Sequence, residues 1–199
     1  MENTPPPDTR EATDSEAIAE SVTEPERFSQ IFDRHWDAIH RYVVRRLGPE
    51  VAEDVSAETF VVAFRARARY DLTRPDARPW LFGIATNLIG EHRRVERRRQ
   101  RALARANAEW MTLPFDEGSD ARVTAQRLGP RIASALTRLS AAERDLLLLI
   151  AWADLTYDEA AQALELPLGT VRSRLHRVRG KLRRAFGGID PSRLQEEFA

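Results

Sequence analysis

The stretch over residues 155–184 constrains the fold most, because it places a capped helix, a break and a second, basic helix in succession. Thr156 is followed three residues later by Glu159, a capping box that predicts the start of a helix ending near Leu164. A proline and a glycine within 167–169 mark the break. A helix-turn-helix needs this order to place its second helix in the major groove of DNA.

The helix predicted beyond the break has an apolar face and a basic face. The apolar residues that recur at helical spacing are Val171, Leu175, Val178 and Leu182. The residues that project to the other side are Thr170, Ser173, Arg174, Arg177, Lys181 and Arg184. No acidic residue lies between Leu168 and Arg184, so this helix does not repel a phosphate backbone. Ser173, Arg174 and Arg177 are the candidates for reading bases, although a basic, solvated helix explains the same charges.

Composition supports a nucleic-acid partner and excludes several other classes. The formal charge of zero hides a mainly acidic segment over residues 2–26 and an arginine-rich one over residues 93–105. The chain has no cysteine, which excludes disulfides, thiol catalysis and cysteine zinc sites. The apolar stretch over 146–152 is far shorter than the ~20 residues that span a bilayer. We therefore expect a cytoplasmic protein without membrane insertion, metal or cofactor.

The 199 residues are enough for two small domains, and the absence of a strand pattern predicts an all-α fold. The predicted order is a disordered acidic tail over 1–24, a helical domain over 25–102, a flexible linker over 103–123, a second helical domain over 124–187 and a tail over 188–199.

Helix signals divide the two predicted domains further. An apolar stripe that begins at Phe28 ends at Gly48, a second helix is predicted over 51–68, and Pro79 opens a third. In the second domain, a capping box starting at Ser140 predicts a helix over 141–153 that leads directly into the helix-turn-helix.

The helix predicted over 51–68 is apolar on two sides. One side carries Val51, Val55, Thr59 and Val62, and Phe60 and Phe64 lie roughly opposite. A helix with two apolar sides needs two partners, one of which can be a second protein. Asp54 and Glu58 then form a carboxylate ridge suited to arginines on that protein. A central bundle helix with solvated acids explains the same pattern.

The segment over residues 78–101 is apolar up to Ile89 and densely cationic afterwards, which predicts that the helix leaves the core there. One ridge of this helix carries Asn87, Glu91, Arg94 and Arg98. An amide that can contact bases is thus aligned with two arginines that can bind phosphates. Trp80 and Phe82 are candidates for stacking on an unpaired base, although aromatic residues at this spacing commonly pack in a core.

Together these segments resemble the extracytoplasmic-function group of bacterial sigma factors, in the sigma-70 family, over about residues 28–186. The family pattern of Ala-Glu-Asp followed by Glu-Thr-Phe is matched at 52–54 and 58–60, with Ala57 where the family often has glutamine. In the family this helix docks on the clamp helices of the RNA polymerase β′ subunit. The residues that the resemblance implies for core polymerase binding are Asp54, Glu58, Thr59 and Phe60.

The other two segments match the family as well. Pro79, Trp80 and Leu81 begin the segment that, with the preceding loop, is implied to read and melt the promoter minus-ten element. Its implied DNA contacts are Trp80, Asn87, Arg93, Arg94 and Arg98. Residues 169–175 look like the helix that reads the minus-thirty-five element. The implied contacts of that helix are Thr170, Arg172, Ser173, Arg174, Arg177 and Lys181.

The resemblance implies a non-enzymatic protein with a sigma domain 2 bundle and a sigma domain 4 helix-turn-helix. Its implied partners are core RNA polymerase, through the β′ clamp helices and the β flap, promoter DNA and an anti-sigma factor. One alternative is a helix-turn-helix regulator that binds an operator without polymerase. Another is a metal-dependent nuclease that uses Asp33, Asp37 and His40, whose spacing an ion pair between Asp37 and Arg41 also explains. Neither alternative accounts for residues 52–60.

Overall fold

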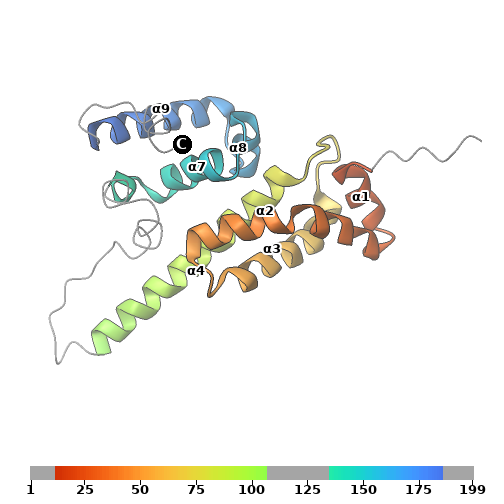
Figure 1. Ribbon diagram of the computed structural model, residues 1–199, viewed down its shortest axis with the longest axis horizontal. Coiled ribbons are helices and arrows are strands. Elements are labelled where there is room, and N and C mark those ends of the chain that lie inside the picture. Colours follow the sequence, from red (N-terminus) through yellow and green to blue (C-terminus); the bar gives the residue numbers. More distant parts are fainter. Residues whose placement is uncertain (1–11, 107–134, 186–199) are drawn as a thin grey trace, which may run out of the picture.

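The computed structural model describes residues 12–106 and 135–185, and all regular elements in these two ranges are helical, as predicted (Figure 1). The first unit contains α1 (Asp14–Ser21), η1 (Pro25–Phe28), α2 (Ser29–Leu47), α3 (Ala52–Ala66), η2 (Arg67–Arg69) and α4 (Arg78–Ala106). The second unit contains α7 (Ala141–Trp152), α8 (Tyr157–Ala163) and α9 (Leu168–Ala185). None of these helices is long and apolar enough to cross a bilayer. The predictions for residues 1–11, 107–134 and 186–199 lie outside the described residues.

Helix α1 corrects the prediction that the chain is disordered up to residue 24. Thr13 starts the helix with a capping box, in which its hydroxyl accepts from the amide of Glu16 and its own amide donates to the Glu16 carboxylate. Ala17 and Ile18 are fully buried against the rest of the first unit. Two apolar side chains in an acidic segment are enough to dock a helix when neighbouring elements cover them.

Helix α3 packs against both α2 and α4, which also contact each other. Its buried residues are Ala52, Ser56, Thr59, Phe60 and Ala63. This set corrects the predicted division of the helix, because Thr59 and Phe60 share the buried side, whereas Val55 and Val62 are only half-buried. The small residues in the set allow α3 to approach its neighbours closely, which explains why they are inside in place of the valines.

The second unit follows the predicted helix signals closely. Capping boxes start α7 at Ser140 and α8 at Thr156, each with a glutamate three residues later. Leu146 and Leu149 of α7 are fully buried, and α9 packs against both α7 and α8. The turn between α8 and α9 contains Glu165 in the left-handed backbone region, with a φ of 51°.

The two units contact each other along α4 and α8, and one continuous apolar core extends through both. The Arg46 side chain, 1% exposed at the end of α2, donates to Asp145 of α7 at 2.5 Å and to the Tyr42 hydroxyl at 2.6 Å. The Arg78 guanidinium donates to the carbonyl of Ala153 at 2.9 Å. The sequence did not predict this contact between the units.

Candidate nucleic-acid and polymerase interface

Helix α9 has the two faces that the sequence predicted. Val171, Leu175 and Val178 are 0%, 3% and 0% exposed and pack inward. Arg172 and Arg177 are exposed, and Arg174 is half-buried. Arg172 and Arg174 have no hydrogen-bond or ion-pair partner in the described part of the chain, so their guanidinium groups are available to an external anion.

Two backbone contacts organise the exposed side of α9. The Ser173 hydroxyl donates to the carbonyl of Thr170 at 3.0 Å, and the Arg177 Nε donates to the carbonyl of Ser173 at 3.4 Å. The second contact uses only Nε, which leaves the terminal nitrogens of Arg177 for a bidentate partner such as guanine or phosphate.

Lys181 differs from the other predicted DNA contacts. Its ammonium donates to both carboxylate oxygens of Glu143, at 2.8 and 2.7 Å, and so joins α9 to the first turn of α7. This hydrogen bond is the main reason that the pKa of Glu143 lies below its usual value. The lysine therefore stabilises the second unit, a role that sequence spacing could not reveal because its partner lies 38 residues away.

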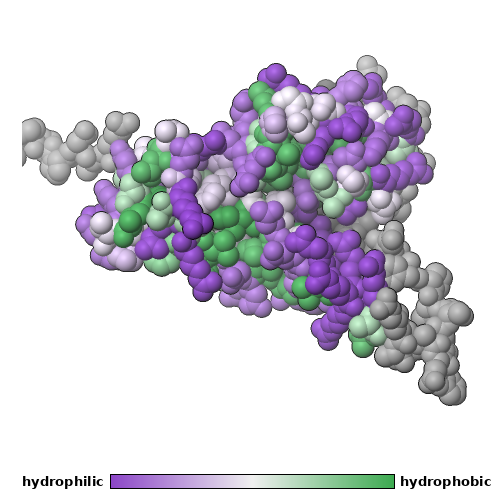
Figure 2. Space-filling view, turned by 180° about the vertical axis from the view of Figure 1, so that it is seen from behind, coloured by the Kyte–Doolittle hydropathy of each residue, from purple (hydrophilic) through white to green (hydrophobic). Residues whose placement is uncertain are grey.

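Helix α4 presents the predicted ridge to solvent. Asn87, Glu91, Arg94 and Arg98 are all exposed. Glu91 lies 3.8 Å from Arg94 in a solvated contact, which holds the arginine only weakly. Seen from behind, the part of α4 that extends away from the first unit is covered mainly by hydrophilic residues (Figure 2).

Arg93 does not belong to this ridge, which corrects its predicted position on the DNA-binding surface. It is 7% exposed and donates to the carbonyl of Arg46 at 2.8 Å, so that α4 is tied to the end of α2. Adjacent helical residues point about 100° apart, so Arg93 and Arg94 cannot share a face. Arg93 instead follows Ile89 on the buried side.

The two candidate stacking residues also differ from each other. Phe82 is 1% exposed and makes an edge contact with the Tyr42 ring at 5.2 Å, so it belongs to the core and cannot stack on a base. Trp80 is half-buried, with its ring 4.9 Å from that of Tyr70. Of these two residues, only Trp80, at the start of α4, remains available to stack on an unpaired base.

The predicted polymerase-binding residues divide into exposed acids and buried supports. Asp54 and Glu58 are exposed on α3. Thr59 is buried and donates to the carbonyl of Val55 at 2.8 Å, and Phe60 is 5% exposed. The Phe60 ring packs against two aromatic rings of α2, with its centroid 5.0 Å from that of Phe32 and 5.9 Å from that of Trp36. Thr59 and Phe60 thus hold the carboxylate ridge in place.

The three residues of the nuclease alternative lie in different surroundings. Asp33 and Asp37 are exposed, while His40 contacts the Ser56 hydroxyl at 3.3 Å and stacks on Trp36. Across residues 12–106 and 135–185, these three side chains do not form a group with the spacing of metal ligands. His35, on the same helix, is buried.

An arginine-rich helix face on each of two packed helical units, the second built as a helix-turn-helix, defines a two-part DNA-binding protein. The family model "Sigma-70 region 2" matches residues 31–99, and "Sigma-70, region 4" matches residues 130–182. The chain therefore belongs to the sigma-70 family of RNA polymerase sigma factors, in the extracytoplasmic-function group.

Relatives and solved structures agree with this assignment. The RNA polymerase sigma factor NccH of Alcaligenes xylosoxydans is 31% identical over 84% of this chain and 91% of its own length. The sigma factor CnrH of Cupriavidus metallidurans is 33% identical over 78% of this chain and 84% of its own length. The structure of CnrH in complex with the cytosolic domain of CnrY is similar with a TM-score of 0.58 at 27% identity, covering 87% of this chain and 97% of that one. The fold is also that of RpoE from Bartonella quintana, solved with the anti-sigma factor NepR, at a TM-score of 0.53 and 22% identity, over 81% of this chain and 98% of that one.

Proposed function

We propose that this protein is an alternative sigma factor, which binds bacterial core RNA polymerase and directs initiation at promoters that both of its units read. The observation that carries the proposal is the presence, in one chain of this family, of two exposed basic helix faces on different units. Each face alone makes few contacts, so binding to polymerase would supply affinity by fixing both on one DNA molecule. Catalysis of RNA synthesis belongs to polymerase, and the protein would act with it in the cytoplasm.

In this proposal α9 reads the minus-thirty-five element in duplex DNA. Its contacts would come from Arg172, Arg174 and Arg177, with Thr170 and Ser173 on the same side. Arginine can contact guanine through two parallel hydrogen bonds, whereas Ser and Thr hydroxyls accept or donate to several bases. Arginine side chains therefore supply the strongest base discrimination on this helix.

The minus-ten element would be read by the exposed side of α4. Asn87 would contact a base, Arg94 and Arg98 would bind phosphates, and Trp80 would stack on an unpaired base. Holding a flipped base offsets an unpairing cost of a few kcal/mol, which is how a protein without catalytic chemistry favours an open duplex. Arg93 would contribute from inside, by fixing α4 to α2.

The carboxylates of Asp54 and Glu58 would meet cationic side chains of the β′ clamp helices, supported from below by Thr59 and Phe60. The second unit would dock on the β flap. Since CnrH and the Bartonella RpoE were solved with CnrY and an anti-sigma factor respectively, we further propose an anti-sigma factor as a partner of this chain.

Reconstitution with bacterial core polymerase tests the proposal. The protein should confer initiation at a defined set of promoters, and Asp54→Arg should weaken core binding, while Asp33→Arg, which reverses an exposed charge on α2, should not. An absence of core binding by the unaltered protein would refute the proposal. Tight operator binding without polymerase would favour the alternative of a simple helix-turn-helix regulator.

A further inference from the structure

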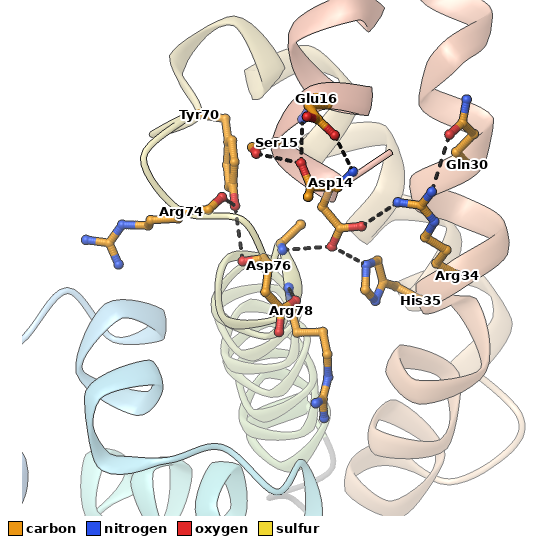
Figure 3. Close-up of polar contacts among 12 residues, drawn as sticks. Asp14, Ser15, Glu16, Gln30, Arg34, His35, Tyr70, Arg74, Asp76 and Arg78 are labelled. Carbon is orange, nitrogen blue, oxygen red and sulfur yellow. Dashed lines mark hydrogen bonds and ion pairs between the residues drawn. The ribbon is translucent and has the colours of Figure 1, made fainter. Parts of the chain in front are cut away.

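A single carboxylate connects the N-terminal helix to the loop that precedes α4 (Figure 3). Asp14, the first residue of α1, is buried and accepts hydrogen bonds from the Arg34 guanidinium at 3.0 Å, from His35 Nε2 at 2.6 Å and from the backbone amide of Ala77 at 2.9 Å. The first two donors lie on α2, and the third lies immediately before α4. One side chain therefore joins three segments that are far apart in the sequence.

These contacts hold Asp14 in its charged form. Burial alone would raise the pKa of this carboxyl, but the hydrogen bonds from His35 and Ala77 outweigh burial and lower the pKa to about 2. Atoms of Asp14, His35 and Asp76 lie within 4.8 Å of one another, the spacing of metal ligands. Because Arg34 and the Ala77 amide already donate to the carboxylate, no cation is needed to balance its charge.

The loop that Asp14 holds is also braced from within. The Tyr70 hydroxyl donates to the carbonyls of Arg74 and Asp76 at 2.8 and 3.1 Å, and the Asp76 carboxylate accepts from the amide of Arg78 at 2.8 Å. At the tip of the loop, the Leu72 side chain is 54% exposed. The loop thus presents an exposed apolar side chain from a fixed backbone beside the start of α4.

We propose that Asp14 is a positioning residue for minus-ten recognition. By holding Ala77, it fixes where the loop tip with Leu72 lies relative to the exposed side of α4, and so determines which base positions the tip can discriminate. The inference rests on the proposed function, in which α4 reads this element. Asp14 lies outside the match to the region 2 family model, which covers residues 31–99.

The choice of substitution separates the loop contact from the charge. Asp14→Ala removes the acceptor for the Ala77 amide, whereas Asp14→Asn retains an oxygen for it but loses the charge that pairs with Arg34. Tyr70→Phe loosens the same loop from inside without touching α1, so it tests the idea even where the Asp14 variants fold poorly.

The measurement is reconstituted initiation by the full chain with core polymerase, on promoters carrying single base changes in either element. A mismatched base pair typically changes binding by about 1–3 kcal/mol, or roughly 5- to 150-fold. We expect Asp14→Ala and Tyr70→Phe to reduce discrimination at one or more minus-ten positions by about fivefold or more, with minus-thirty-five discrimination unchanged and Asp14→Asn close to the unaltered protein.

Two results would overturn the inference: unchanged minus-ten preferences in a folded Asp14→Ala variant, or an equal loss at both elements. Inactivity of the unaltered protein with core polymerase would be a different result, because it would refute the proposed function itself.

Discussion

Replacing Gly83 with alanine tests the contact between the two units most directly. A Cβ atom built on Gly83 would lie 2.4 Å from the carbonyl oxygen of Ala163, in α8, and 3.2 Å from its carbonyl carbon. Close carbon-to-oxygen contacts in proteins normally have separations of about 3.3–3.6 Å. Since the obstacle is backbone, no side-chain rotation relieves the overlap, and α4 and α8 must move apart by about 1 Å.

Gly90 supplies a matched control on the same helix. A Cβ built there meets no atom within 4 Å. Both substitutions gain up to about 1 kcal/mol of helix propensity, so the difference between the two variants isolates the steric term. Overpacking of this kind typically destabilises a protein by about 1–3 kcal/mol. We therefore expect Gly83→Ala to unfold with a free energy about 1–3 kcal/mol below that of Gly90→Ala.

Urea unfolding measures this difference in free energy, and a distance measurement between the two units shows whether α4 and α8 move apart. The chain has no cysteine, so cysteines introduced at Asp33 and Asp158, one on each unit, can carry a fluorescent donor and acceptor. The distance between them should increase in Gly83→Ala and stay the same in Gly90→Ala. Equal stabilities together with equal distances in the two variants would show that α4 and α8 do not pack against each other in solution.

Three further predictions concern charged residues. Folding lowers the pKa of Asp14 from 3.8 to about 2, so this residue contributes about 2 kcal/mol to the free energy of unfolding above pH ~4, and the contribution is lost as the pH falls through 2. Urea midpoints measured against pH should show this loss in the unaltered protein and not in Asp14→Asn. Parallel curves for the two proteins would contradict the prediction. Lys181→Met should lower the free energy of unfolding by about 1 kcal/mol, because the Glu143 contact is lost, and should leave the salt dependence of DNA binding unchanged. A weaker dependence of DNA binding on salt would instead mean that Lys181 binds phosphate. Arg177→Ala should lose about 1–3 kcal/mol of discrimination at one base pair of the minus-thirty-five element in competition binding, and a uniform loss across sequences would assign it to phosphate.

Local signals in the sequence predicted most helices of the described residues, and α1, which was not predicted, shows that such signals carry no information on contacts between distant segments. Capping boxes and apolar spacing located α7, α8 and α9, because both signals are contained within one or two turns of helix. Helix α1 also has a capping box, but its segment is acidic and contains few apolar residues. Its docking depends on Asp14 meeting His35 and Ala77, contacts that only the folded chain brings together.

The same limit applies to the candidate site, where the sequence predicted which segments are basic but not what each cation contacts. Arg46, Arg93 and Lys181 have intramolecular acceptors on other helices, whereas Arg98 and Arg177 are on the surface. The cations near the helices proposed to read DNA therefore form two groups, one that joins helices within the protein and one that is exposed to solvent. Removing a member of the first should lower the free energy of unfolding and affect all promoters alike, since it alters the amount of folded protein. Removing a member of the second should leave stability intact and change binding in a way that depends on DNA sequence or salt.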